Sequence, residues 1–136
     1  TRMAIAGSAS DYIKELYDKM RYLEKQLSQY LTPEYSCDDI YQQGIELAKE
    51  LGVIDYYLGS ANHREKFVGH GIGVELNEFP FLASGLDFKL QAGMTIALEP
   101  KLVIPDIGVI GIENDYVVTE KKPKKLTIAD EELIIV

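Results

Sequence analysis

FVGHGIGVELNEFP, residues 67–80, opens the stretch that decides the fold of this 136-residue chain. Two further segments complete it: GMTIALEP at 93–100 and GVIGIENDYVVT at 108–119. Each segment carries one side chain that is a good metal ligand, namely His70, Glu99 and Glu113. His70 lies between two glycines, Glu99 ends an apolar run before a proline, and Glu113 interrupts a second apolar run. Burying such a group unpaired costs about 1–3 kcal/mol or more. A cation shared among the three would remove that cost, so the pattern predicts a metal site.

Short runs of branched aliphatic residues follow residue 93 and are separated by turn-forming pairs. The runs cover residues 94–98, 102–104, 109–112 and 116–119. Runs of this length between Pro-Asp and Asn-Asp pairs are typical of strands joined by turns. Two strands joined by a turn can bring Glu99 and Glu113 to the same face of a sheet.

The first helix is predicted over residues 8–31, where apolar residues recur every three or four positions. Ser8 and Asp11 have the spacing of a capping box at its start. Before it, residues 1–7 have the pattern of a strand that ends on a glycine.

A second helix is predicted over residues 36–51, with Ser36 and Asp39 at its start and Gly52 as its stop. Gly44 lies inside this helix and is a mild defect, tolerable where another backbone packs closely. The two helices and the strands together predict an α+β fold, with two helices packed on one face of a curved antiparallel sheet.

Composition excludes several function classes. Lys and Arg number 14 against 22 Asp and Glu, a net charge of −8, which argues against a nucleic-acid partner. Cys37 is the single cysteine, so neither an internal disulfide nor a cysteine-based zinc cluster is expected. The sequence has no long apolar run and no secretory leader, so we expect a cytoplasmic protein without a membrane partner. The length fits one domain.

The three segments resemble a family. They are similar to the C-terminal half of the pita-bread metallopeptidases. The similar motifs are His-Gly-Ile-Gly followed by Asn-Glu-x-Pro, then Gly-Met ending in Glu-Pro, then Gly-Ile-Glu-Asn-x-Tyr-Val-Val-Thr. This family includes methionine aminopeptidase, aminopeptidase P, prolidase and creatinase, and the resemblance covers about residues 1–127. It implies that the whole chain, 1–136, is one truncated domain: the C-terminal part of a pita-bread catalytic domain.

The resemblance also implies the ligand roles. His70 and Glu99 would bind one of two divalent metal ions (Mn, Co, Fe or Zn), and Glu113 would bridge both. Glu99 would also act in catalysis by carrying a proton to the leaving nitrogen. Two aspartate ligands would lie outside this chain, one of them two residues upstream of Thr1. The implied reaction is hydrolysis of an N-terminal peptide bond through a dinuclear metal-bound hydroxide.

Three departures from the family pattern bear on the substrate. Asn77 replaces the usual histidine, and we expect it to bind substrate by a hydrogen bond without carrying a proton. Lys101 replaces a common glycine, and Gly111 replaces a frequent arginine. These changes favour an Xaa-Pro dipeptidase or aminopeptidase acting on a small peptide.

Two other functions stay open at this point: a non-catalytic pita-bread binding module and a creatinase-like C–N hydrolase. This chain alone, with three of five ligands, is expected to be inactive. The resemblance also allows a homodimer.

Overall fold

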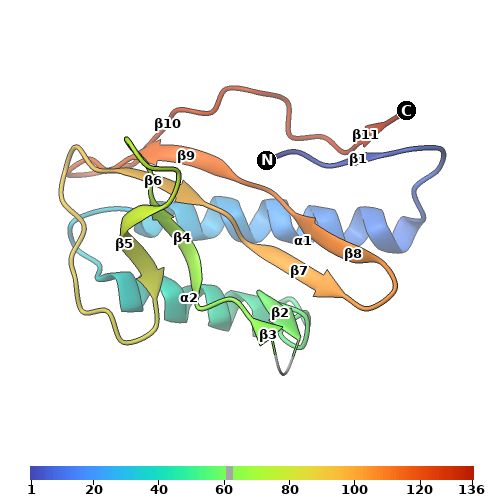
Figure 1. Ribbon diagram of the computed structural model, residues 1–136, viewed down its shortest axis with the longest axis horizontal. Helices are drawn as coiled ribbons and strands as arrows, with labels where there is room; N and C mark the ends of the chain where they lie inside the picture. The colour runs from blue at the N-terminus through green and yellow to red at the C-terminus, as the bar shows by residue number, and fades with distance from the viewer. Residues whose placement is uncertain (61–62) are drawn as a thin grey trace.

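The computed structural model describes residues 1–60 and 63–136, and Figure 1 shows the path of the chain. Two helices are followed by a series of short strands. The helical elements are α1 (Asp11–Leu27), a 3-10 turn η1 (Ser28–Tyr30) and α2 (Cys37–Glu50). The strands are β1 (Ala4–Ile5), β2 (Gly59–Ser60), β3 (His63–Arg64), β4 (Phe67–Gly71), β5 (Glu78–Ala83), β6 (Thr95–Leu98), β7 (Lys101–Ile104), β8 (Gly108–Gly111), β9 (Asn114–Val117), β10 (Lys124–Lys125) and β11 (Ile134–Ile135).

Helix α1 begins later than the sequence predicts. The side chain of Ser10, not Ser8, accepts a hydrogen bond from the backbone N–H of Ile13 at 3.3 Å and caps the helix. Gly7 has a φ of 92°, which turns the chain out of the β1 strand before the helix can start. The predicted apolar stripe is confirmed, because its central residues are buried: Leu16, Tyr17, Met20, Leu23 and Leu27.

Helix α2 begins and ends as the sequence predicts. Ser36 and Asp39 form a reciprocal capping box, and Gly52 takes the left-handed conformation with a φ of 68°. The close neighbour of Gly44 is a side chain and not a backbone. A Cβ at this position would lie 2.7 Å from the hydroxyl oxygen of Tyr57, so a side chain, not a backbone, packs against it.

The main sheet has five strands in the order β10-β9-β6-β4-β5, all antiparallel to their neighbours. Strands β7 and β8 form a separate hairpin that continues the direction of β6 and β9. The predicted strands exist, with ends shifted by up to two residues. The predicted strand over 1–7 is reduced to β1, which pairs in parallel with β11.

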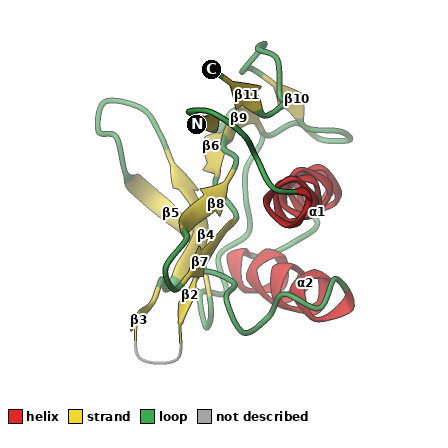
Figure 2. Cartoon of the chain, turned by 90° about the vertical axis from the view of Figure 1, so that its right-hand side faces the viewer, coloured by secondary structure: helices red, strands yellow, loops and turns green. Residues whose placement is uncertain are grey.

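Both helices cover the same face of the sheet, as Figure 2 shows, with α1 beside the β8–β9 side and α2 near β5. The core lies between these layers and includes Tyr17, Met20 and Leu23 from α1 and Ile96 and Leu98 from β6, all no more than 1% exposed. The predicted α+β class is therefore confirmed. No helix in the described ranges has the length and apolar character needed to cross a membrane.

Candidate metal centre

The predicted site residues line one cavity of about 450 Å³ on the sheet. It is bordered by Glu65, Phe67, His70, Leu76, Asn77, Glu99, Lys101 and Glu113. His70, Glu99, Glu113 and Asn77 come from separate segments of the chain. The fold therefore brings together the side chains that the sequence singles out.

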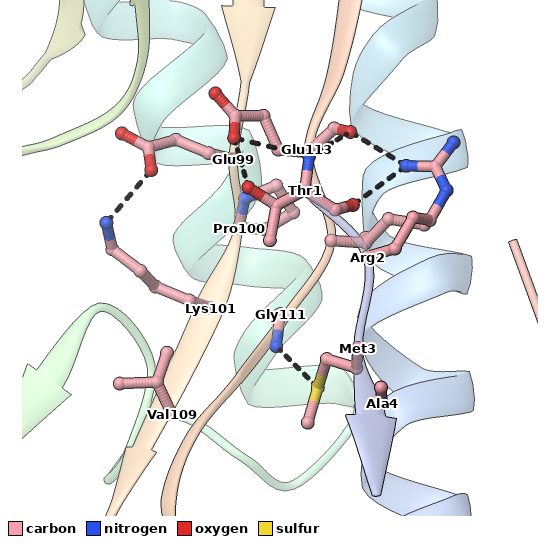
Figure 3. A pocket seen from close by; sticks show the side chains of 11 residues that line it. Thr1, Arg2, Met3, Ala4, Glu99, Pro100, Lys101, Val109, Gly111 and Glu113 are labelled. Atoms are coloured by element: carbon pink, nitrogen blue, oxygen red, sulfur yellow. Dashed lines mark hydrogen bonds and ion pairs between the residues drawn. The ribbon is translucent and has the colours of Figure 1, made fainter. Parts of the chain in front are cut away.

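Strand pairing explains this convergence. Strands β4, β6 and β9 are direct neighbours, with His70 opposite Ala97 and Leu98 opposite Asn114. Glu99 follows the last residue of β6, and Glu113 precedes the first residue of β9. Both glutamates thus lie at the junction between the β6–β9 pair and the β7–β8 hairpin. Their carboxylates lie at the same end of β6 and β9 (Figure 3).

The glycines beside His70 let neighbouring strands approach it. A Cβ on Gly69 would lie 2.6 Å from the carbonyl oxygen of Ala97, and one on Gly71 would lie 2.5 Å from that of Phe79. Only glycine fits these contacts without a backbone shift. His70 itself is 3% exposed.

The His70 imidazole has one nitrogen tied to the backbone and one directed toward a carboxylate. Its Nδ1 lies 2.9 Å from the carbonyl oxygen of Gly71, which can only accept, so Nδ1 carries the hydrogen. Nε2 then has its lone pair available in the neutral ring, and it lies 3.7 Å from Oε1 of Glu99. Metal-binding histidines are commonly oriented in this way.

Glu99 and Glu113 each accept a hydrogen bond from a neighbouring side chain. Oε2 of Glu99 accepts from Nζ of Lys101 at 3.0 Å, and Oε2 of Glu113 accepts from the hydroxyl of Thr1. Burial raises the pKa of Glu113, and the hydrogen bond from the Thr1 hydroxyl lowers it. An ionised carboxylate is the form that binds metal.

The donor atoms fit a divalent transition metal, although they do not form a closed cage. One imidazole nitrogen with carboxylate oxygens suits Mn²⁺, Co²⁺, Fe²⁺ or Zn²⁺. Two atoms bound to one ion at about 2.0–2.2 Å are about 3.0–3.5 Å apart, close to the spacing between His70 and Glu99. Among the residues that the structure describes, no three His, Cys, Asp or Glu side chains are grouped closely enough to hold a metal ion.

Asn77 lies at the cavity rim and is exposed to solvent. It is thus available to a ligand, although its contact with substrate stays a prediction.

Other residues of the site were not identified by sequence reasoning. Lys101 stood out only as a departure from a pattern, and its ion pair with Glu99 joins residues two positions apart, whose side chains share one face of an extended segment. Outside the cavity, sequence reasoning also missed Glu24 on the first helix, which is 1% exposed. Its signal was a carboxylate four residues after Met20 and three before Leu27, on the apolar face.

A sheet cavity that gathers an imidazole and two carboxylates is the kind of site used by metal-dependent hydrolases. Metallopeptidase family M24 matches residues 1–120, and the chain belongs to this family. The predicted resemblance to the pita-bread metallopeptidases is thereby confirmed.

Three known proteins illustrate which peptidases this chain resembles. An Xaa-Pro dipeptidase of Pyrococcus furiosus is 30% identical over 134 residues, which cover 98% of this chain and 36% of that protein. The solved structure of an Xaa-Pro dipeptidase from Bacillus anthracis has a TM-score of 0.86 at 30% identity, covering 99% of this chain and 36% of that one. An X-Pro aminopeptidase from Thermotoga maritima has a TM-score of 0.89 at 22% identity, a likeness in fold alone, over 99% of this chain and 36% of that one. This chain thus spans little more than a third of the length of these relatives.

Proposed function

We propose that this chain is the C-terminal part of the catalytic domain of a metal-dependent peptidase that hydrolyses Xaa-Pro peptides. The observation that carries the proposal is that His70 on β4, Glu99 directly after β6 and Glu113 directly before β9 line one cavity. The Xaa-Pro dipeptidase names of relatives at 30% identity support the substrate class.

Each residue has a distinct role in this proposal. Nε2 of His70 and the carboxylates of Glu99 and Glu113 would hold a pair of divalent ions. When bound, such ions act as Lewis acids and lower the pKa of a bound water. By the resemblance, Glu99 would also carry the proton to the leaving nitrogen. Its Oε1 faces His70 and its Oε2 faces Lys101. Asn77 would orient the peptide through a hydrogen bond, worth about 0.5–1.5 kcal/mol.

The ligand set on this chain is three of the five that the resemblance implies. We infer that the other two are carboxylates supplied by the remainder of a longer protein, which the 36% coverage of the relatives supports. The isolated 136-residue chain is then expected to bind Mn²⁺ weakly and to hydrolyse Xaa-Pro dipeptides little or not at all. Robust turnover by this chain alone would overturn the assignment of ligands to another segment.

The test compares two substitutions in the full-length protein. Glu113→Gln is expected to lower kcat far more than it raises KM for an Xaa-Pro dipeptide, because it removes a metal ligand. Asn77→His is expected to change the preference among peptides with a smaller loss of activity. If both variants kept wild-type activity, the catalytic assignment of this cavity would fail.

A non-catalytic binding module is the second candidate function. It is favoured by the ion pair between Lys101 and Glu99, because a lysine already neutralises a predicted metal ligand. The two functions differ in metal dependence. Peptidase activity that disappears with a chelator and returns with Mn²⁺ supports the first, whereas peptide binding unaffected by the chelator supports the second.

A further inference from the structure

A buried polar cluster lies on the helix side of the sheet, directly behind the cavity. Its two central members are Asn114, 0% exposed, and Glu24, 1% exposed. Asn114 is the residue after Glu113 and the first residue of β9, while Glu24 comes from the apolar face of α1. Such a costly pair of buried polar groups has no part in the proposed chemistry.

All hydrogen-bonding groups of the Asn114 side chain are used. Nδ2 donates to Oε1 of Glu24 at 3.0 Å and to Oε1 of Glu131 at 3.1 Å. Oδ1 accepts from Nη2 of Arg2 at 2.9 Å. A side-chain amide is the group that offers two donors and an acceptor together, so neither aspartate nor leucine can replace these contacts.

The cluster also holds the backbone of Glu113. Nη1 of Arg2 donates to the carbonyl oxygen of Glu113 at 3.0 Å, while its Nη2 binds Asn114. Figure 3 shows the guanidinium beside the Glu113 main chain, on the side opposite the Glu99 carboxylate. Arg2 therefore links the backbone of Glu113 to the side chain of Asn114.

We propose that Asn114 is a positioning residue for Glu113. Successive side chains along a strand point to opposite faces of the sheet. Because the Asn114 side chain is hydrogen-bonded to Glu24 of α1 and to Glu131 on one face, the preceding side chain, Glu113, points to the other face and into the cavity. The inference rests on the proposed function, because it assumes that Glu113 binds metal. Residues that orient metal ligands typically change metal affinity about 10–100-fold when replaced.

The experiment measures Mn²⁺ affinity of the full-length protein by calorimetry and by the Mn²⁺ electron paramagnetic resonance signal. Asn114→Asp keeps the size of the side chain but turns its donors into acceptors facing two carboxylates. We expect affinity to fall about tenfold or more. Glu24→Gln added to Asn114→Asp restores a donor between α1 and β9, and we expect it to recover part of the lost affinity.

Tyr116→Phe is the matched control. The Tyr116 hydroxyl donates to the same oxygen of Glu24 at 2.7 Å, and Tyr116 lies two residues further along β9. Its loss is expected to lower thermal stability and to leave Mn²⁺ affinity within about threefold, because it does not contact the Glu113 peptide or Arg2.

The possible results distinguish the inference about Asn114 from the proposed function. If Asn114→Asp keeps wild-type affinity, or if Tyr116→Phe weakens binding equally, Asn114 does not position Glu113. If Asn114→Asp does not fold, the test uses Asn114→Ala, which removes all three side-chain contacts, and wild-type affinity there overturns the inference. Loss of binding in His70→Ala alongside unchanged binding in Asn114→Asp leaves the proposed function intact. Wild-type Mn²⁺ binding that is indifferent to His70→Ala overturns both.

Discussion

Nε2 of His70 and Oε1 of Glu99 face each other at 3.7 Å across the cavity, with Nδ1 of His70 held by the carbonyl of Gly71. This separation is too long for a hydrogen bond and close to the spacing of two atoms bound to one ion. The two side chains come from neighbouring strands, β4 and the end of β6. The relationship leads to a direct prediction about metal binding.

Glu99→Gln in the full-length protein is expected to weaken Mn²⁺ binding about tenfold or more, because an amide oxygen is a poorer ligand than a carboxylate. Glu65→Gln is the matched control, since Glu65 lines the same cavity, is exposed and is not a predicted ligand. Glu65→Gln is expected to change Mn²⁺ affinity by less than about threefold, because it removes only an exposed charge that salt screens. Calorimetric titration distinguishes the two, and equal effects of both variants would contradict the assignment.

Gly71→Ala is expected to destabilise the chain by about 1–3 kcal/mol, because the new Cβ would overlap the backbone of β5. The obstructing atoms are the carbonyl oxygens of Phe79 at 2.5 Å and Glu78 at 2.8 Å, and neither can rotate away. At Gly73 the nearest atoms to a Cβ belong to the carboxylate end of the flexible Glu78 side chain, which accepts a hydrogen bond from the backbone N–H of Glu75 at 3.1 Å. Gly73→Ala should therefore cost less than Gly71→Ala, at most the loss of that hydrogen bond, about 0.5–1.5 kcal/mol. Urea unfolding of the two variants tests the difference.

Tyr57→Phe is expected to stabilise the protein by about 1 kcal/mol. The Tyr57 hydroxyl is buried and has no hydrogen-bond partner in the parts of the chain that the structure describes. Urea unfolding measures the gain, and a clear loss of stability would show that the hydroxyl is satisfied.

Gly44→Ala is expected to be destabilising alone, because its Cβ would lie 2.7 Å from that hydroxyl oxygen. In the Tyr57→Phe background the same change should cost less, because only the contact with Cδ2 of Leu27 at 3.3 Å stays tight and helix propensity gains up to about 1 kcal/mol. A double-mutant cycle measures this coupling, and additive effects would disprove it.

Burial raises the pKa of the Cys37 thiol to about 11. Between the ordinary thiol pKa of about 8.5 and this value, the unfolded chain loses the proton while the folded chain keeps it. Stability that is fully present below about pH 8.5 is therefore lost progressively as the pH rises toward 11. Melting temperatures of wild type and Cys37→Ala should diverge in slope over this range. The native thiol should also react with a disulfide reagent at pH 8 only after unfolding.

The local pattern of the sequence was sufficient for several parts of the protein. Helix α2 follows from an apolar stripe, a Ser36–Asp39 box and Gly52, all of which act within a few residues. The identity of the three candidate ligands follows from polar groups placed inside apolar runs. The ends of α1 were less predictable, because Ser8 and Ser10 are both good caps. The choice between them depends on the pairing of β1 with β11, more than a hundred residues away.

Only the tertiary structure decided how the candidate site is assembled. The meeting of His70, Glu99 and Glu113 depends on the order β9-β6-β4, and strand order is a non-local property that side-chain periodicity does not encode. The contact between Asn114 and Glu24 joins residues 90 positions apart, and it forms because a sheet and a helix that both bury apolar faces must pack against each other. Sequence therefore specified which groups are chemically able to act, and packing of the layers determined which of them lie within reach of one another.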